Sequence, residues 1–158
     1  MQSRRNFFNK CSLILAAAII GLSAGKLSWA ADVPVDMSTN KAASEAKDTA
    51  GVLTALGVQN PGPGKRILLD LPEIVDEKVN VVIKVKSAIP NTDWIAVLVD
   101  KNPHPFVNQF DLTGTKTMAI EVSAKLAQTS TVIAIVRADG KYYRVDKEVK
   151  VAVAGGCE

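Results

Sequence analysis

The residue best placed for covalent chemistry is Cys157, close to the end of the chain. It follows Gly155 and Gly156 and precedes Glu158. Two glycines remove the side-chain restraint on the backbone, so we expect them to act as a flexible hinge. From Ala154 the extended chain reaches at most about 10 Å to the Cα atom of Cys157. A thiol on such an arm can enter a pocket of another protein, which a thiol in a packed core cannot do.

The residues alone leave three roles open for Cys157. The thiol can hold a substrate covalently, it can tie the chain to a partner through a disulfide, or it can be incidental in a frayed tail. A solitary exposed cysteine in an oxidising compartment is open to unwanted disulfides and over-oxidation, which argues against the incidental role. Glu158 places carboxylate charge beside the sulfur, and like charge disfavours the thiolate. We therefore expect the pKa of the Cys157 thiol to lie at or above its ordinary value.

His104 is the second candidate, and it lies between two prolines in residues 102–106. A lone histidine in this setting is most often a polar loop residue. As a metal ligand it lacks companions, because the sequence has one histidine and only one cysteine beyond residue 30. The spacing gives no support to a catalytic pair of Cys157 and His104. The prolines restrict the backbone to an extended turn, so this loop is predicted to be a shaped contact surface.

No other segment carries the residues of a self-contained active site. The sequence has no glycine-rich phosphate loop after a strand, no paired-carboxylate signature and no nucleophile elbow. Tyr143 falls in the valine-lined register of its strand, so core packing is its expected role. The aromatic residues beyond residue 30 are too few and scattered for a nucleotide or sugar platform; they are Trp94, Phe106, Phe110, Tyr142 and Tyr143. We expect no enzyme activity, no cofactor and no metal.

Length and charge limit what the rest of the chain can be. At 158 residues it has the length of one domain, and a hydrophobic fraction of 47% is enough for a packed core. The first thirty residues hold four of the 19 basic side chains and none of the 16 acidic ones. The remaining 15 basic side chains are balanced by those 16 acidic ones, so we expect no polycationic surface for nucleic acid.

Residues 1–30 have the pattern of a secretory signal peptide. A polar, positive segment precedes an apolar run, and small residues stand at Ser28 and Ala30, so we predict cleavage after Ala30. Two arginines followed by Phe7 are typical of the twin-arginine export route, with an ordinary Sec signal as the alternative. The apolar run is too short to span a bilayer, and Cys11 lacks the neighbours of a lipoprotein signal. The predicted location is the periplasm, without a membrane anchor.

Residues 31–64 are expected to hold a leader, one helix and a linker. In residues 41–56 apolar side chains recur every three or four positions, which marks one helical face; they are Ala43, Ala46, Ala50, Leu53 and Leu56. Gly57 is expected to end this helix. The Asn-Pro-Gly-Pro-Gly run of residues 60–64 then breaks the regular structure.

Residues 65–154 are predicted to form a β-sandwich of about seven short strands. Residues 79–86 and 117–123 alternate apolar and polar side chains, as half-buried strands do. Residues 131–136 are apolar on both faces, as expected of a central strand. Asp139-Gly140 predicts a two-residue hairpin before the last strand, residues 142–153. The other expected strands are residues 67–71, 94–99 and 107–112, and residues 155–158 are left as the flexible arm.

Taken together, these elements resemble the SoxY family, the cysteine-bearing subunit of the SoxYZ thiosulfate-oxidation carrier. The most specific pieces are residues 100–105, similar to the family's Lys-Asn-Pro-x-Pro segment, and the Gly-Gly-Cys of residues 155–157 directly after the final strand. Residues 124–140 are also similar in pattern. The resemblance covers essentially the whole mature chain and implies an immunoglobulin-like sandwich preceded by a short helix.

The resemblance implies a carrier that is not itself an enzyme. Cys157 is the implied covalent attachment site, with Gly155 and Gly156 as its hinge. The implied partners are SoxZ, another β-sandwich protein that forms a heterodimer; the cytochrome complex SoxXA, which joins thiosulfate to the cysteine; the hydrolase SoxB, which releases sulfate; and in some organisms a sulfane dehydrogenase. Glu158 departs from the family's usual Gly-Gly-Cys-Gly-Gly ending, which leaves the fit of the tip to these partners open.

The sequence therefore favours a periplasmic carrier on which sulfur intermediates travel as adducts of Cys157. The alternative is a structural subunit that the same cysteine ties to a partner by a disulfide. A sandwich used for adhesion or ligand binding is a third hypothesis, in which Cys157 has no function.

Overall fold

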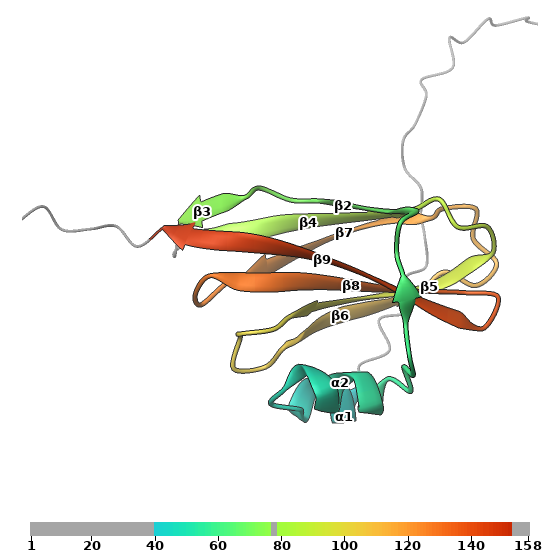
Figure 1. The fold of residues 1–158 in the computed structure, drawn as a ribbon, viewed down its shortest axis with the longest axis horizontal. Helices are drawn as coiled ribbons and strands as arrows, with labels where there is room; N and C mark the ends of the chain where they lie inside the picture. The colour runs from blue at the N-terminus through green and yellow to red at the C-terminus, as the bar shows by residue number, and fades with distance from the viewer. Residues whose placement is uncertain (1–39, 77–78, 153–158) are drawn as a thin grey trace, which may run out of the picture. The chain divides into compact units, whose positions relative to one another are not determined.

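Two β-sheets pack face to face in residues 40–76 and 79–152, the part of the chain that the computed structural model describes (Figure 1). The large sheet has the strand order β1-β9-β8-β5-β6, with β3 also paired to β9, and the small sheet has the order β2-β4-β7. The strands are β1 (Gly62–Pro63), β2 (Ile67–Asp70), β3 (Ile74–Asp76), β4 (Asn80–Ser87), β5 (Thr92–Val99), β6 (Phe106–Asp111), β7 (Ala119–Lys125), β8 (Ser130–Ala138) and β9 (Lys141–Ala152). The predicted mostly-β sandwich is confirmed, and its seven expected strands are all present.

The main core lies between the two sheets and follows the alternation in the sequence. Along β4 every second residue is buried, so Val81, Ile83 and Val85 face the large sheet. On β8 both faces are covered: Val132 and its even-numbered neighbours enter the main core, whereas Ile133 and Ile135 lie under the helices. The prediction of a central strand that is apolar on both faces is therefore confirmed.

The helical segment covers the outer face of the large sheet as two helices, α1 (Lys41–Glu45) and α2 (Thr49–Ala55) (Figure 1). The predicted single helix over residues 41–56 is wrong, because the chain becomes extended at Ala46 (φ −65°, ψ 137°). The buried helical side chains are Ala43 and Val52, whereas Ala50 is exposed. Breaking the helix lets each short piece place one apolar side chain on the curved sheet.

Gly57 ends α2 in the left-handed conformation, with φ +70°, as the sequence predicts. The backbone N–H of Gly57 donates to Thr54 O at 3.0 Å, and that of Val58 donates to Leu53 O at 2.9 Å. These two bonds occupy carbonyl groups that the end of a helix leaves without partners. The chain then turns away from the helices with Val58 buried beneath them.

The Pro-Gly segment predicted as a linker is part of the large sheet. Its β1 strand runs parallel to β9, with Gly62 opposite Tyr143. The backbone N–H of Gly64 donates to Arg144 O at 2.7 Å, and a Cβ atom added at Gly64 would lie only 2.6 Å from that oxygen. The segment therefore crosses the edge of the large sheet at close range, on its way from the helices to β2 of the small sheet.

The β8–β9 hairpin turns on Asp139 and Gly140, both with positive φ (50° and 71°). This is the pattern of a type I′ turn, whose twist matches that of the strands it joins. Ala138 pairs with Lys141 directly across the turn, so the predicted two-residue hairpin is confirmed. The turn sets the register of β9 and hence the point at which the chain leaves the sandwich at its far end.

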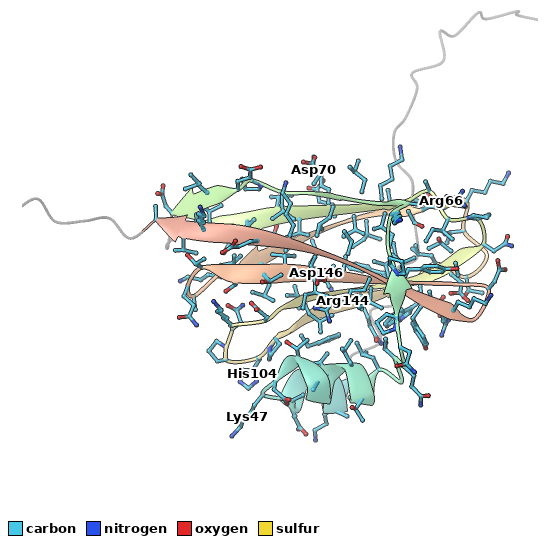
Figure 2. The ribbon with its side chains drawn as sticks, in the orientation of Figure 1. Lys47, Arg66, Asp70, His104, Arg144 and Asp146 are labelled. Atoms are coloured by element: carbon cyan, nitrogen blue, oxygen red, sulfur yellow. The ribbon has the colours of Figure 1, made fainter. Side chains whose placement is uncertain are left out.

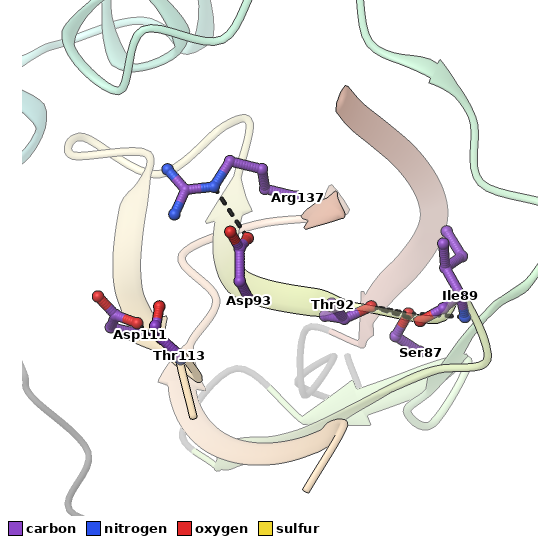
Figure 3. Close-up of polar contacts among 7 residues, drawn as sticks. All are labelled: Ser87, Ile89, Thr92, Asp93, Asp111, Thr113 and Arg137. Atoms are coloured by element: carbon purple, nitrogen blue, oxygen red, sulfur yellow. Dashed lines mark hydrogen bonds and ion pairs between the residues drawn. The ribbon is translucent and has the colours of Figure 1, made fainter. Parts of the chain in front are cut away.

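A buried hydroxyl pair holds the connection between the two sheets (Figure 3). The Oγ atoms of Ser87 and Thr92 are 2.7 Å apart, and Thr92 donates to Ile89 O at 2.8 Å. The N–H of Ile89 donates to Ser87 Oγ at 3.1 Å. Since both hydroxyls have partners, burying them at the β4–β5 turn carries little cost.

Asp111, at the end of β6, is expected to make stability depend on acid pH. Its pKa lies below its ordinary value because the hydroxyl and the backbone N–H of Thr113 bind the carboxylate; the N–H lies 2.8 Å from Oδ1 (Figure 3). Because the pKa is lower in the folded state, the ionised Asp111 carboxylate stabilises the fold. This stabilisation is fully present above the unfolded-state pKa of about 3.9 and is lost as pH falls through the folded-state pKa. Asp111→Asn should therefore flatten the fall in unfolding free energy below about pH 4. Urea titrations between neutral and acid pH measure this, and parallel curves for the two proteins would contradict it.

Candidate functional site at the root of the arm

The last strand, β9, is the base from which the chain continues toward Cys157. It pairs with β8 over Lys141–Val149, and on its other edge with β1 near its start and β3 near its end. Val149 is fully buried in the main core. The strand is thus held on both edges and on its inner face (Figure 1).

Two hydrogen bonds extend this hold past the end of the β8 pairing. The N–H of Lys150 donates to Glu73 O at 2.8 Å, just before β3. The N–H of Val151 donates to Thr129 Oγ1 at 3.0 Å, so a side chain takes over where β8 no longer offers a backbone partner. The chain is therefore fixed through Val151, and Ala152 is still paired with Asp76.

The predicted site residues Gly155, Gly156, Cys157 and Glu158 lie outside the residues that the structure describes. Their roles as hinge, attachment site and tip stay predictions. The same holds for the signal peptide of residues 1–30 and for its predicted cleavage. What the structure provides is the fixed point from which these last residues extend.

The loop with His104 lies at the same end of the sandwich as this fixed point. It follows β5, whose Val99 pairs with Val132 near the start of β8, beside the end of β9. Figure 2 places His104 on this loop, and its side chain is exposed, as expected of a polar loop residue. Among the described residues no cluster of histidine, cysteine, aspartate or glutamate could hold a metal ion.

Asn102 fixes the position of this loop, a role that the sequence did not reveal. Its Oδ1 accepts from the N–H of Ala127 at 3.1 Å, and its Nδ2 donates to Lys125 O at 2.9 Å. In addition, Asp100 Oδ1 accepts from the N–H of Thr131 at 2.7 Å. The loop is therefore tied to the β7–β8 connection, a long-range contact for which the local sequence gives no signal.

A shallow hollow lies between β3 and β9 beside the point where the chain leaves the sandwich. We call it the arm-root hollow; its volume is about 280 Å³ and it is lined by Glu73, Ile74, Lys147, Glu148 and Lys150. Ile74 is 66% exposed there. Lys147 donates to Leu71 O at 3.0 Å, whereas none of the ion pairs found among the described residues involves Glu73, Glu148 or Lys150. The hollow thus combines an exposed apolar side chain with charges of both signs.

A second hollow lies on the outer face of the small sheet, toward the opposite end. It has a volume of about 340 Å³, and its lining includes Leu68, which is 62% exposed. Leu68 pairs with Lys86 near the end of β4, whereas Ile74 pairs with Lys150 near the end of β9. Two comparably exposed apolar side chains therefore mark two separate surfaces.

The sandwich is similar to that of a known sulfur carrier protein. The structure of the sulfur carrier protein SoxY from Chlorobium limicola f thiosulfatophilum is 26% identical, with a TM-score of 0.60, over 65% of this chain and 94% of that one. The family model for the sulfur oxidation protein SoxY matches residues 53–157. Because this match covers more than half of the chain, the protein belongs to the SoxY family, and the resemblance seen in the sequence is confirmed.

The other comparisons give one partial structural likeness and no curated relative. A superoxide reductase (neelaredoxin) from Ignicoccus hospitalis has a TM-score of 0.48 and 19% identity over 54% of this chain and 79% of that one. A search of curated protein sequences gives no significant match. No helix among the described residues is long and apolar enough to cross a membrane.

Proposed function

We propose that the protein is a periplasmic sulfur carrier that holds thiosulfate-derived intermediates covalently on Cys157 and presents them to Sox enzymes. The observation that carries this proposal is the family match, which extends to Cys157 itself. The geometry supports it, since β9 is fixed through Val151 and so provides a rigid base for a reactive tip. Family membership assigns the chain to sulfur oxidation; the cysteine, the compartment and the presentation are our proposal.

The proposed chemistry needs no catalytic group on the carrier. The Cys157 thiolate and thiosulfate join through a new S–S bond, and the two electrons released pass to a SoxXA-like cytochrome. Water then cleaves the terminal S–SO₃ bond of this adduct at a SoxB-like hydrolase, which gives sulfate, two protons and a deprotonated persulfide (–S–S⁻) on Cys157. In organisms that have one, a sulfane dehydrogenase oxidises the remaining outer sulfur, with oxygen taken from water and the electrons passed to the redox acceptor of that enzyme. The enzymes supply the catalysis, and the carrier supplies the thiol and its reach.

The proposed permanent partner is a SoxZ-like β-sandwich protein in a heterodimer. An open sandwich has edge strands with unpaired backbone groups, and such edges favour pairing with another chain. Here β7 and β2 are the edges of the small sheet and β6 is an edge of the large one. Twin-arginine export accepts folded cargo, so we propose that the pair assembles before it leaves the cytoplasm.

Intact-mass measurement tests the proposed function. Protein taken from thiosulfate-fed cells should carry thiosulfonate or persulfide mass on the C-terminal peptide, and these adducts should disappear on reduction. They should be absent from protein of cells grown without a reduced sulfur source. If the peptide carries only free thiol and disulfide, the carrier proposal fails.

The same samples test the alternative, in which the protein is a structural subunit tied to a partner by a disulfide. On a non-reducing gel, a carrier that cycles should show disulfide-linked species only below stoichiometric amounts and reversibly. A stoichiometric linked species that persists during thiosulfate oxidation would favour a disulfide-tethered subunit.

A further inference from the structure

We propose that the arm-root hollow is the docking surface for one enzyme, the hydrolase that receives the thiosulfonate adduct of Cys157. This inference rests on the proposed carrier function and adds to it a defined contact surface on the sandwich. The hollow is lined by Glu73, Ile74, Lys147, Glu148 and Lys150. Neither the thiol nor the glycine hinge forms part of it.

The length of the chain beyond the last strand places the receiving enzyme at this surface. Cys157 lies five positions after Ala152, so the two Cα atoms are at most about 17 Å apart when the chain is extended. An enzyme that encloses the sulfur must therefore bring its own surface close to the end of β9. Ile74 pairs with Lys150, which lies only two positions before Ala152.

The side chains at the hollow have the composition of a small, transient interface. Ile74 offers an apolar contact, being 66% exposed although it belongs to a strand. Glu148 and Lys150 of β9 and Glu73 just before β3 also line the hollow, and they form none of the ion pairs found in the described residues. Complementary charges around an apolar centre steer a partner and fix its orientation. The matching surface is an apolar side chain flanked by a carboxylate and a basic group.

A permanent partner fits this surface less well than a visiting enzyme. A protein seated permanently beside Lys150 and Ala152 would stand in the way of each enzyme that has to reach the arm. Stable complexes also bury large surfaces, whereas short-lived encounters use small ones, and this hollow is small. The hollow around Leu68 lies on the other sheet and leaves the root of the arm free.

The test compares Ile74→Asp with Leu68→Asp, two substitutions that place the same charge at similarly exposed apolar positions. Cells of the source organism that carry each variant of the full chain are fed thiosulfate and then washed. The decay of the thiosulfonate adduct of Cys157, which the hydrolase consumes, is followed by intact mass. We expect Ile74→Asp to slow this decay about fivefold or more, the effect of losing a central interface contact, while Leu68→Asp stays within about twofold of the unaltered protein.

Two further measurements separate docking from other effects. Iodoacetamide should alkylate Cys157 at the same rate in both purified variants, and their thermal unfolding temperatures should match within a few degrees. Lys150→Glu, which changes only an exposed charge, should also slow the decay of the adduct. This result would support docking even if the aspartate of Ile74→Asp destabilises β3.

The outcomes are distinct. Equal decay in Ile74→Asp and the unaltered protein overturns the docking proposal, and so does equal slowing in Leu68→Asp. Loss of the heterodimer in Ile74→Asp, seen by light scattering, assigns the hollow to the permanent partner and also overturns it. Absence of any adduct in the unaltered protein overturns the carrier function itself, and the docking proposal with it.

Discussion

Cells in which Cys157 is replaced by alanine are expected to lose thiosulfate oxidation completely. The reason is chemical: under the proposed function every sulfur intermediate is bonded to this sulfur, and no other cysteine is present beyond residue 30. Thiosulfate consumption and the oxygen uptake that accompanies it measure the effect. The matched control is Cys11→Ala, which removes the other cysteine of the chain and should leave both rates unchanged, because Cys11 lies in the predicted signal peptide.

The loss in Cys157→Ala should not come from unfolding. Cys157 lies five residues beyond the last residue of β9, so the purified variant should unfold at the same temperature as the unaltered protein. Retained thiosulfate oxidation in Cys157→Ala would exclude both the carrier and the disulfide-tethered subunit, and would leave the third hypothesis of an adhesion or ligand-binding module.

Gly64→Ala is expected to lower the free energy of unfolding by about 2–4 kcal/mol, through forced overpacking and the loss of a backbone hydrogen bond. The added Cβ atom would lie 2.6 Å from Arg144 O and 2.8 Å from Ile67 Cδ1. The oxygen belongs to the backbone of β9, which cannot move without disturbing its pairing with β8. Urea unfolding followed by circular dichroism measures the change.

Gly62→Ala is the matched control for Gly64→Ala. It lies two residues earlier in the same segment, and its nearest contact would be an ordinary 3.7 Å to the ring of Tyr143. We expect a change within about 0.5 kcal/mol. If both substitutions cost the same, the crossing of β9 at Gly64 is looser than its geometry implies.

The sequence was most informative where burial repeats along the chain. The alternation along β4 reflects one covered face, and the two apolar faces of β8 reflect cover on both sides. The sequence predicts both features correctly. The alternation does not mark the strand ends: Val79 fits it but lies before β4 and is 52% exposed. The predicted strand over residues 117–123 lies instead at Ala119–Lys125.

The strands that the sequence missed are those that exist only through a distant partner. The strands β1 and β3 have two and three residues, too few to show a period, and both form by pairing in parallel with β9. The break between α1 and α2 has a similar origin, since a regular helix would continue the apolar pattern but would leave Val52 off the sheet. Such effects depend on tertiary contacts that no local pattern records.

The candidate site also has one part that the local sequence reveals and one part that only tertiary contacts create. Cys157 and its glycines stand out because their residue types are unusual at that position. The arm-root hollow does not stand out, because Ile74 and Lys150 are ordinary residues that become neighbours only when β3 pairs with β9. The fixing of the loop by Asn102 depends likewise on residues about 25 positions away.

The two-sided pairing of β9 also has a mechanical consequence. Tension applied beyond Ala152 runs along the strand axis, so it loads the hydrogen bonds to β8, β1 and β3 in shear, many at once, instead of peeling them apart one by one. A ladder in shear resists force far better than one that unzips. An enzyme could therefore draw the cysteine into a narrow channel, and pull against it, while the sandwich stays folded.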